Sequence, residues 1–287
     1  MVTTFQKIKN RISSHEEENI LFGKDTLKQA TDSILYKNNQ NQFSVNIDRL
    51  FICVRDGELA TNFLERLGLK SHQTIIRSTS QGTLSKIFFF NNLYLEIIWL
   101  ERESGQNREE LSTVINFKAR TNWEQNKVSP VGIGICSDRA VPRLNFVPLR
   151  VHRDREKGNN NSYLFDTNLL NDLILDDLFC CFQQNCKNYL EPFIFLLPEY
   201  LTVRDNLPQI ANSELIKHPL GVKNITNIKI NLLRGRRRSS NVLKLLNSSK
   251  VLQVEYSESP LIEVTLDCGI NQQIIDARPL IPLVLKY

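Results

Sequence analysis

The chain has 287 residues, of which 41% are hydrophobic, and its 36 basic and 31 acidic side chains give a formal charge of +5. This size and composition allow one large domain or two closely packed modules with a full core, and they exclude disorder of the whole chain. Because the two signs of charge are mixed along the sequence, a nucleic-acid partner is not expected.

Two features of the sequence bear on its location. The strongest apolar run, Phe193 to Leu197, ends at Pro198, far short of the roughly 18 residues that a membrane span needs. The stretch from Met1 to Ile12 is polar and basic, and it lacks the apolar core of a secretory signal. We therefore expect a cytoplasmic protein without a membrane partner.

The six cysteines form no CxxC pair, so reduced thiols are expected in such a chain. Cys180, Cys181 and Cys186 lie close together in the sequence, which leaves two interpretations open: a metal or redox role, or a cysteine-rich apolar segment. The spacing alone does not choose between them.

Residues 1–43 are expected to form a helical leader. Asp25 and Thr26 can begin a helix whose apolar stripe runs from Leu27 to Leu35, and an Asn/Gln-rich stretch ends it. The leader would dock on the main body or on a partner, in a structural or a regulatory role.

Residues 44–130 are expected to form a first module, because the hydrophobic period changes to that of strands at Val45. The predicted order is strand, helix and three strands, over residues 45–54, 56–67, 73–77, 84–90 and 93–100. Gly68 supplies the end of the helix, and Asn91-Asn92 suits a tight turn between the last two strands.

Residues 131–217 are expected to hold linking strands and an insertion. The strands cover residues 131–136 and 193–197, and the insertion between them covers about residues 137–190. Within the insertion we expect a loop at 157–161 and a helix at 169–182.

Residues 218–287 repeat the order of the first module, though not its letters. We expect a strand at 225–232, a helix at 241–247, and strands at 251–256 and 261–267. The segment 278–285 contains two prolines and is expected to be an extended edge segment.

Seven blocks of letters resemble glyoxalase-like domain proteins of the vicinal-oxygen-chelate superfamily, and they occur in that family's order between about residues 45 and 287. They are IDRLFICV (47–54), LERLGL (64–69), QGT (81–83), FFFNNLYLEIIWL (88–100), EPFIFLLP (191–198), HPLGVKNIT (218–226) and RPLIPLVL (278–285). The leader and the insertion lie outside the resemblance. It implies an α+β fold of tandem βαβββ modules, glyoxalase/bleomycin-resistance-like, whose curved sheets enclose a cleft.

The resemblance also implies a metal site, in which the first and last strands of each module supply the ligands. The last-strand glutamates match Glu96 and Glu263, so both are candidate metal ligands and catalytic acids or bases. The first-strand position, commonly histidine, is Arg49 in the first module and Asn227 in the second. The usual metal site is thus altered by an arginine.

Strand alternation gives an independent test of the site residues that the resemblance implies, since residues two apart on a strand share a face. Between 225 and 267 one face is apolar, and the other carries Asn227, Lys229 and Glu263. That polar face lines either the cleft or open solvent. In the first module, Arg49 and Phe51 share a face, and pairing of Arg49 with Glu96 or Glu263 would avoid burying an unpaired charge.

Electrostatics weighs against an ordinary metal centre. A guanidinium about 5 Å from a divalent ion is repelled by roughly 6 kcal/mol at an effective dielectric near 20. If a metal binds, the oxygen ligands favour magnesium, manganese or calcium over zinc. Arg49 would otherwise take the place of the metal and hold an anionic oxygen, with Glu96 or Glu263 as proton acceptor.

Two further residues match the family blocks. Gln81 lies in a loop that either shapes a rim of the cleft or simply needs the glycine that follows it. His218 precedes Pro219 at the entry to the second repeat, where a structural elbow is favoured over a catalytic base. The candidate ligand-binding residues are therefore Phe51, Gln81, His218, Asn227 and Lys229.

Two functions follow from these features. One is an enzyme of the isomerase, lyase or oxygenase kind that acts on a small oxygenated, anionic metabolite, with metal dependence in doubt. The other is a non-catalytic protein that binds or sequesters a small molecule. The retained glutamates favour the first, the missing histidine favours the second, and a homodimer is compatible with both.

Overall fold

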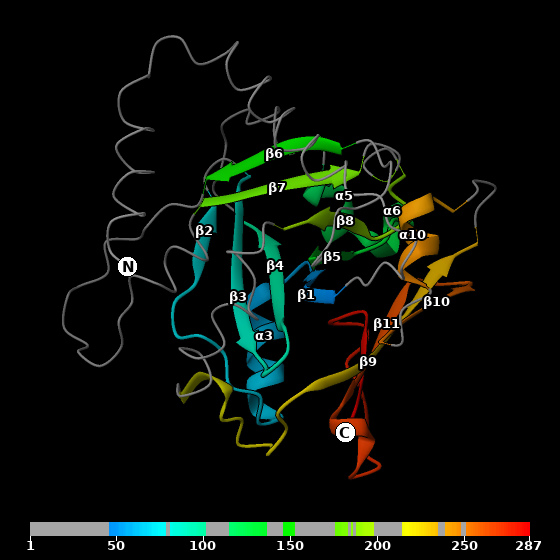
Figure 1. Ribbon diagram of the computed structural model, residues 1–287. Helices are drawn as coiled ribbons and strands as arrows, with labels where there is room; N and C mark the ends of the chain where they lie inside the picture. Colours follow the sequence, from blue (N-terminus) through cyan, green and yellow to red (C-terminus); the bar gives the residue numbers. More distant parts are fainter. Residues whose placement is uncertain are drawn as a thin grey trace, which may run out of the picture. The chain divides into compact units, whose positions relative to one another are not determined.

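The computed structural model describes residues 46–78, 81–101, 115–136, 146–152, 176–182, 185, 188–197, 214–234, 239–247 and 251–287, with the backbone alone for 146–152 and 176–182. These residues form an α+β fold of two mixed sheets with few helices (Figure 1). The expected leader at 1–43 and loop at 157–161 lie outside them. No helix in this part of the chain combines the length and apolar character needed to cross a bilayer.

The larger sheet has eight strands in the order β2-β3-β4-β1-β5-β8-β7-β6. Their bounds are β1 Asn46–Cys53, β2 Ile76–Ser78, β3 Thr83–Phe89, β4 Tyr94–Leu100, β5 Val131–Cys136, β6 Phe146–His152, β7 Asp176–Phe182 and β8 Phe193–Leu196. β1 is parallel to β4 and antiparallel to β5, and β5 is parallel to β8. In Figure 1, β6 and β7 run across the direction of β3 and β4.

The predicted order of strand, helix and three strands between residues 45 and 100 is confirmed. Helix α3, Gly57–Arg66, begins at Asp56, whose side chain accepts a hydrogen bond from the backbone of Leu59. It ends before Gly68, which adopts φ +91°, a conformation that favours glycine. Ala60 and Leu64 are buried, and α3 packs against β4, where Trp99 fills the space beside Gly57.

Two strands of the insertion, β6 and β7, are part of the larger sheet, which the sequence did not predict. Residues 176–182, expected to end a helix, form strand β7, paired with β6 on one side and β8 on the other. The reason is tertiary: a segment rich in Phe, Leu and Cys gains two strand partners here, and these outweigh its weak helical pattern. Strands β5 to β8 therefore belong to the same sheet as β1 to β4.

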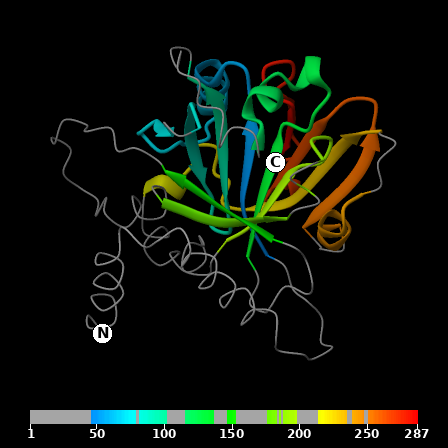
Figure 2. The same ribbon diagram turned by 90° about the horizontal axis from the view of Figure 1, so that it is seen from above.

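The smaller sheet has five strands in the order β10-β9-β11-β13-β12. Their bounds are β9 Ile225–Leu233, β10 Leu252–Ser257, β11 Leu261–Leu266, β12 Ile274–Asp276 and β13 Leu283–Lys286, with helix α10, Asn241–Leu246, between β9 and β10. Figure 2 shows this sheet, coloured yellow to red, beside the strands of the larger one.

The smaller sheet does not repeat the pairing of residues 46–100. There, the parallel partner of β1 is β4, and β2 lies at the edge. Here, the parallel partner of β9 is β10, the strand that follows α10 directly. The expectation that 218–287 copies the first module is thus wrong for the strand arrangement, because the order of elements along the chain does not fix which strands pair.

The C-terminal segment also differs from expectation. β13 is not an edge strand, since it lies between β11 and β12. Both prolines of the segment, Pro279 and Pro282, precede the strand, so neither interrupts its pairing. The edge strand is β12, which has three residues and is too short to show a clear alternation of apolar and polar residues.

Candidate functional site

One face of the larger sheet carries most of the predicted site residues, and we call it the Arg49 face. It contains Arg49, Phe51 and Cys53 of β1 together with the residues paired with them, because paired residues on neighbouring strands share a face. On β4, Tyr94, Glu96 and Ile98 pair with Arg49, Phe51 and Cys53 in that order. On β5, Gly134 pairs with Arg49 and Gly132 with Phe51. The same two glycines pair with Phe195 and Phe193 of β8.

Arg49 is held by its own strand and by β4. The pairing of β1 with β5 shifts between Ile47 and Arg49, so Asp48 is an extra residue, as in a β-bulge. The bulge brings Asp48 Oδ2 to 3.1 Å from Arg49 Nε, and both side chains are buried. The guanidinium carbon lies 4.7 Å from the centroid of the Tyr94 ring. Arg49 is therefore neutralised locally and stacked on an aromatic ring.

Glu96 lies next to Phe51 on the same face and is 2% exposed. Arg49 and Glu96 are thus diagonal neighbours on adjacent parallel strands. Arg49 forms an ion pair with Asp48, a residue that the sequence patterns did not single out. A β-bulge cannot be recognised from the alternation of residue types.

Two glycines on β5 make room for the side chains of β1. A Cβ at Gly132 would lie 2.0 Å from Phe51 Cζ, and a Cβ at Gly134 would lie 2.3 Å from Arg49 Cγ. The ring of Phe51 and the stem of Arg49 therefore rest directly on the β5 backbone. The sequence GIG at 132–134 is required for this close approach.

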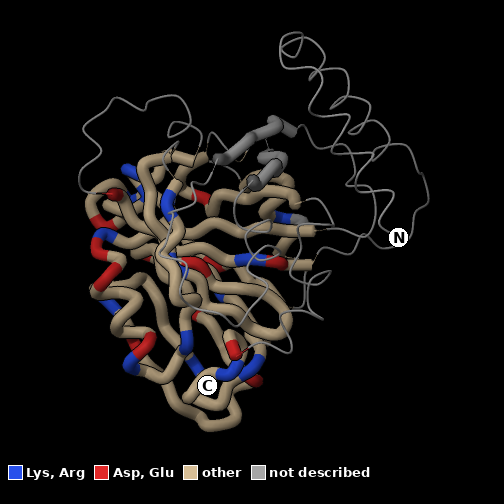
Figure 3. Tube along the Cα trace, turned by 90° about the vertical axis from the view of Figure 1, so that its left-hand side faces the viewer, with Lys and Arg blue, Asp and Glu red and all other residues tan. Residues whose placement is uncertain are grey.

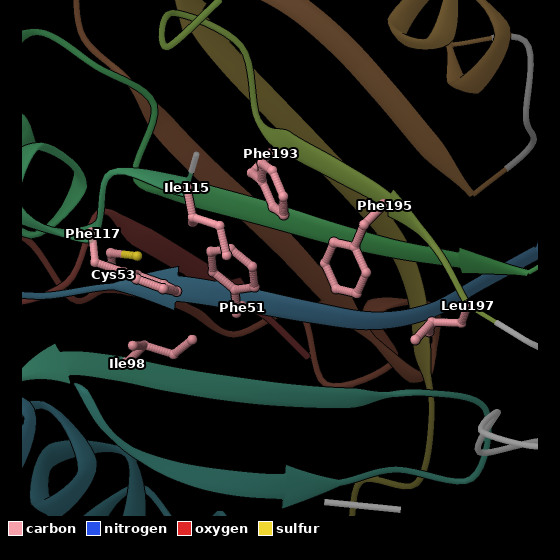
Figure 4. Packing of buried hydrophobic residues seen from close by; sticks show 8 residues of the cluster. All are labelled: Phe51, Cys53, Ile98, Ile115, Phe117, Phe193, Phe195 and Leu197. Atoms are coloured by element: carbon pink, nitrogen blue, oxygen red, sulfur yellow. The ribbon is translucent and has the colours of Figure 1, made fainter. Parts of the chain in front are cut away.

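Phenylalanine side chains fill the rest of the Arg49 face (Figure 4). The rings of Phe51, Phe193 and Phe195 have centroids 5.7 to 6.4 Å apart. Ile115 and Phe117, at the start of helix α5 (Phe117–Thr121), pack on them, and every member of the cluster is at most 5% exposed. Phe51, predicted to bind a ligand, is thus part of a packed core.

A buried polar network supports this core from the side. Arg120 is fully buried and donates hydrogen bonds to the carbonyl oxygens of Ile115, Ser129 and Glu191. The Glu191 carboxylate accepts hydrogen bonds from Asn185 Nδ2 and from the backbone of Ser240, just before α10. Sequence reasoning missed these residues, because nothing in the letters marks a charged side chain as buried.

The same surroundings make Cys53 unreactive. Burial raises the pKa of its thiol to about 12, and the charge of Glu96 also raises it, although Arg120 acts in the opposite direction. At neutral pH the thiolate, which is the nucleophile and the metal ligand, is essentially absent. Cys53 thus serves packing.

Glu263 lies in the smaller sheet, within a network of half-buried charges. Its carboxylate is 2.5 Å from Lys286 Nζ, 3.9 Å from Lys229 Nζ and 3.3 Å from Asn231 Nδ2. Lys229 also pairs with Glu255 at 3.0 Å, and Asn227 is half-buried on the same face. Figure 3 shows positive and negative residues close together along much of the trace.

The expected meeting of Arg49, Glu96 and Glu263 is therefore wrong. Arg49 and Glu96 are on the larger sheet, and the three partners of Glu263 all come from the smaller one. Glu263, Lys229 and Asn227 face partly toward solvent, which is the plainer of the two interpretations that alternation left open. The error comes from treating two similar strand motifs as parts of one repeat.

His218 and Gln81 have structural contacts. His218 Nδ1 accepts a hydrogen bond from the backbone of Lys70 at 2.8 Å, and its Nε2 lies 2.9 Å from the carbonyl oxygen of Phe89. Gln81 is buried in a turn where Gly82 has φ +63°, and its side chain accepts a weak hydrogen bond from Thr83. The contacts of His218 are those of a structural residue, as the sequence favoured, and the turn at Gln81 is one that needs glycine.

The residues of the Arg49 face do not fit a divalent metal ion. Glu96 is the carboxylate on β4, Asp48 is paired with Arg49, and the neighbouring positions on β5 and β8 are glycine and phenylalanine. Within the part of the chain that the structure describes, no three His, Cys, Asp or Glu side chains gather as a metal site would require.

A hollow lies elsewhere, at the end of the smaller sheet. It has a volume of about 220 Å³ and is lined by Leu220, Val222, Leu266, Asp267, Ile270 and Tyr287, among others. Asp267 is held in place, because its carboxylate accepts hydrogen bonds from the backbones of Lys223 and Asn224 at 2.8 and 2.9 Å. The hollow thus has an apolar wall and a fixed acidic group.

Comparison with known proteins gives the fold and no function. No family model matches the chain, and neither does any curated protein. Among solved structures, the chain is similar to a hypothetical protein from Staphylococcus aureus, with a TM-score of 0.50 and 12% identity. The match covers 85% of this chain and 99% of that one, and at this identity it supports a shared α+β fold alone.

Proposed function

We propose that the chain is a glyoxalase-like protein that binds a small oxygenated metabolite without metal chemistry. The observation that carries the proposal is the filled Arg49 face, where phenylalanine and glycine occupy the positions at which a metal centre would need donors. A protein of this lineage that kept its scaffold and lost its donors would act by binding.

The strand order of the larger sheet supports the lineage. The order β2-β3-β4-β1 is mirrored by β6-β7-β8-β5, and the two halves meet where β1 pairs with β5. In each half the first and fourth strands along the chain are parallel neighbours. Under this proposal the paired modules are β1–β4 and β5–β8, and the smaller sheet is an addition to them.

The mirrored halves also identify the positions to compare. The first-strand and last-strand positions are Arg49 and Glu96 in one half, and Gly132 or Gly134 with Phe193 or Phe195 in the other. Of these, Glu96 alone offers an oxygen donor, and a guanidinium stands beside it. A donor set of this kind favours a core over a chelate.

We place the binding site at the hollow near the C-terminus. Ligand pockets are commonly concave and combine apolar side chains with a few fixed polar groups. This hollow likewise combines the side chains of Leu220 and Val222 with the fixed Asp267 carboxylate. Its volume of about 220 Å³ is below the usual range for drug-sized ligands, which are bound in roughly 300 Å³ or more. A compact metabolite with a hydroxyl group that donates to Asp267 would suit it. Because Asp267 is acidic, a neutral ligand is favoured over the anionic one expected from the sequence.

The test uses two exposed isoleucines. Ile270 lines the hollow and is 76% exposed, whereas Ile274 is 68% exposed and does not line it. We expect small neutral polyols and hydroxy ketones to shift backbone amide signals of Val222 and Asp267 in NMR titrations of the wild type. Ile270→Trp fills the hollow and should abolish the shifts, while Ile274→Trp should keep them. Shifts that survive in Ile270→Trp would remove the hollow as the site.

A second candidate function is proton transfer by Glu96. It is favoured by the placement of Glu96 and Arg49 on one face of neighbouring strands, where a guanidinium could stabilise an oxyanion beside a base. Any turnover found with oxygenated metabolites should then fall at least about a hundredfold in Glu96→Gln. Turnover that is unchanged in this variant would exclude the catalytic role.

A further inference from the structure

A short segment joins the smaller sheet to the larger one, and we call residues 214–225 the elbow. Leu215 and Ile216 pack on the apolar cluster of Ile76, Ile87, Phe89 and Tyr94. The backbone of Leu220 donates to the carbonyl oxygen of Gly68 at 2.9 Å, and Gly68 approaches so closely that a Cβ would lie 3.0 Å from Leu220 N.

The far end of the elbow is fixed by the turn between β3 and β4. Asn92 forms a two-point contact with Ile225, donating from Nδ2 to its carbonyl oxygen at 2.6 Å and accepting its N–H at 3.1 Å. The backbone of Asn91 donates to the carbonyl oxygen of Lys223 at 2.9 Å. None of these groups changes charge near neutral pH.

His218 is the titratable anchor of the elbow. Its ring is 6% exposed and lies 4.7 Å from the Phe90 ring, centroid to centroid. Because Lys70 N–H can only donate and Phe89 O can only accept, the bound form is the neutral tautomer with its proton on Nε2. One ring nitrogen is therefore bound to the segment between α3 and β2, and the other to β3 of the larger sheet.

We propose that His218 is an acid-sensitive latch, and that protonation of its Nδ1 releases the elbow from the larger sheet. The added proton would place two donors, Nδ1–H and the N–H of Lys70, against each other at a distance of 2.8 Å. The hydrogen bond is lost, and a charged ring stays buried against Phe90, which is costly.

The charged groups around the ring act in both directions. The Lys70 side chain opposes protonation of His218, and Asp267 favours it. Glu214 and Lys217, at the start of the elbow, pair with each other at 2.6 Å. The other nearby histidine, His72, has its ring centroid 6.5 Å from that of Phe89.

The pH window follows from the direction of the shift. Burial lowers the pKa of His218 below its ordinary value of 6.5, with a smaller opposing effect from Phe89 O. The unfolded or released form therefore binds the proton more readily, so the latch is fully effective above pH 6.5 and weakens as the pH falls below it. The carboxylates titrate at lower pH, which leaves the range from 6.5 to about 5 for histidine.

The latch also regulates the site proposed above, a consequence that rests on the proposed function. Leu220 and Val222 belong to the elbow and line the hollow, as does Asp267. Release of the elbow would take away one wall, so a ligand bound there would be released on acidification.

Hydrogen exchange of the full chain tests the latch without any ligand. Between pH 7 and pH 5 we expect the protection factors of Lys70 and Leu220 amides to fall by up to tenfold per pH unit, the limit for one proton. The amide of Val54, which donates to the carbonyl oxygen of Ile98 within the larger sheet, should keep its protection. Flat protection at Lys70 and Leu220 would overturn the proposal.

Two variants identify the histidine. In His218→Asn the side-chain oxygen lies near the place of Nδ1, so it accepts the Lys70 N–H and cannot be protonated; the pH dependence should vanish. His72→Gln is the matched control and should retain it. If the protection factors lose their pH dependence in His72→Gln and keep it in His218→Asn, the latch is contradicted. If His218→Asn opens at every pH, the NMR titration midpoint of the wild-type His218 ring must coincide with the opening of the elbow.

The ligand consequence has its own readout. Polyol-induced shifts at Val222 should weaken as the pH falls from 6.5 toward 5 in the wild type and persist in His218→Asn. Absence of any ligand shift at pH 7 would remove the proposed function while leaving the exchange result intact. Protection factors of the Lys70 and Leu220 amides that do not change with pH would exclude the latch while leaving ligand binding at pH 7 intact.

Discussion

The two sheets place similar strand motifs in different surroundings. Glu96 in YLEIIW and Glu263 in LIEVTL each lie near the middle of a strand rich in apolar residues. Glu96 is 2% exposed beside Phe51, in a sheet that is buried on both faces at its centre. Glu263 faces partly toward solvent and is surrounded by lysines.

The difference shows that the burial and the partners of a glutamate in an apolar strand cannot be read from the strand sequence alone. In the larger sheet, phenylalanine side chains and helix α5 cover the face that carries the polar residues. In the smaller sheet the corresponding face stays accessible, so its polar residues form ion pairs in water. The following predictions test whether the contrast in environment produces a contrast in behaviour.

The largest expected difference concerns two cysteines. Cys53 lies on the Arg49 face, whereas Cys268 is exposed at the end of the smaller sheet. With a pKa of about 12, Cys53 has about a thousandfold less thiolate at pH 8 than an ordinary thiol at 9.0. We expect iodoacetamide to modify Cys268 at least about a thousandfold faster, as measured by peptide mass mapping over time. Comparable rates at the two sites would show that the core of the larger sheet opens readily.

The next largest effect is expected at Gly132. In Gly132→Ala the new methyl group would overlap the ring of Phe51, at 2.0 Å, and we expect a loss of about 3 kcal/mol in the free energy of unfolding by urea, the upper end of the usual cost of overpacking. Phe51→Ala alone should cost about 3–5 kcal/mol by leaving a cavity. In the double variant the clash is absent, so the two losses should not add. Additive losses would contradict direct packing of Phe51 on β5.

Sequence patterns predicted the larger part of the local structure. The apolar periods of residues 45–100 place β1, α3, β3 and β4 within a residue or two of their observed bounds, because alternation and capping residues are local signals. The pattern at 225–267 likewise predicts β9, α10, β10 and β11. Pairing was not predicted, since β5 next to β1 and β10 next to β9 depend on which surfaces meet in three dimensions.

The candidate site was predicted less well, for physical reasons that concern Arg49 and Gly132. The sequence indicates that Arg49 needs a carboxylate, and the nearest one in the chain, Asp48, reaches it through a bulge that no alternation rule predicts. The GIG at 132–134 carries the information that β5 supports large side chains, yet glycine in a strand indicates a close approach without naming the partner.

Truncation of the two glutamates tests the central comparison. Glu96→Ala removes a buried side chain beside Phe51 and leaves a cavity, so we expect a loss of about 2–4 kcal/mol in the free energy of unfolding. Glu263→Ala disrupts a partly exposed network and should cost about 1 kcal/mol or less. Urea denaturation of both variants at pH 7 measures the difference. Equal losses would mean that the two sheets shield their charges alike.

The smallest effect, and the one specific to the smaller sheet, is the response of Glu263 to salt and acid. Burial alone would raise the pKa of Glu263, but hydrogen bonds from Lys286 and Asn231 and the charges of Lys286 and Lys229 outweigh it and lower the pKa below 4.5. A carboxylate whose pKa is lower in the folded chain than in the unfolded chain stabilises the fold at pH values above the unfolded pKa. This stabilisation is lost as the pH falls below about 4.5.

Salt acts on the same ion pairs. In 1 M NaCl the Debye length shrinks to about 3 Å, so the loss of stability caused by Glu263→Ala should fall by about half or more, while the loss caused by Glu96→Ala should stay within error. Unfolding is measured at low and high salt for each variant at pH 7, and again at pH 4. The two sheets should differ, because screening reaches an ion pair in contact with water and does not reach a carboxylate that is 2% exposed beside Phe51.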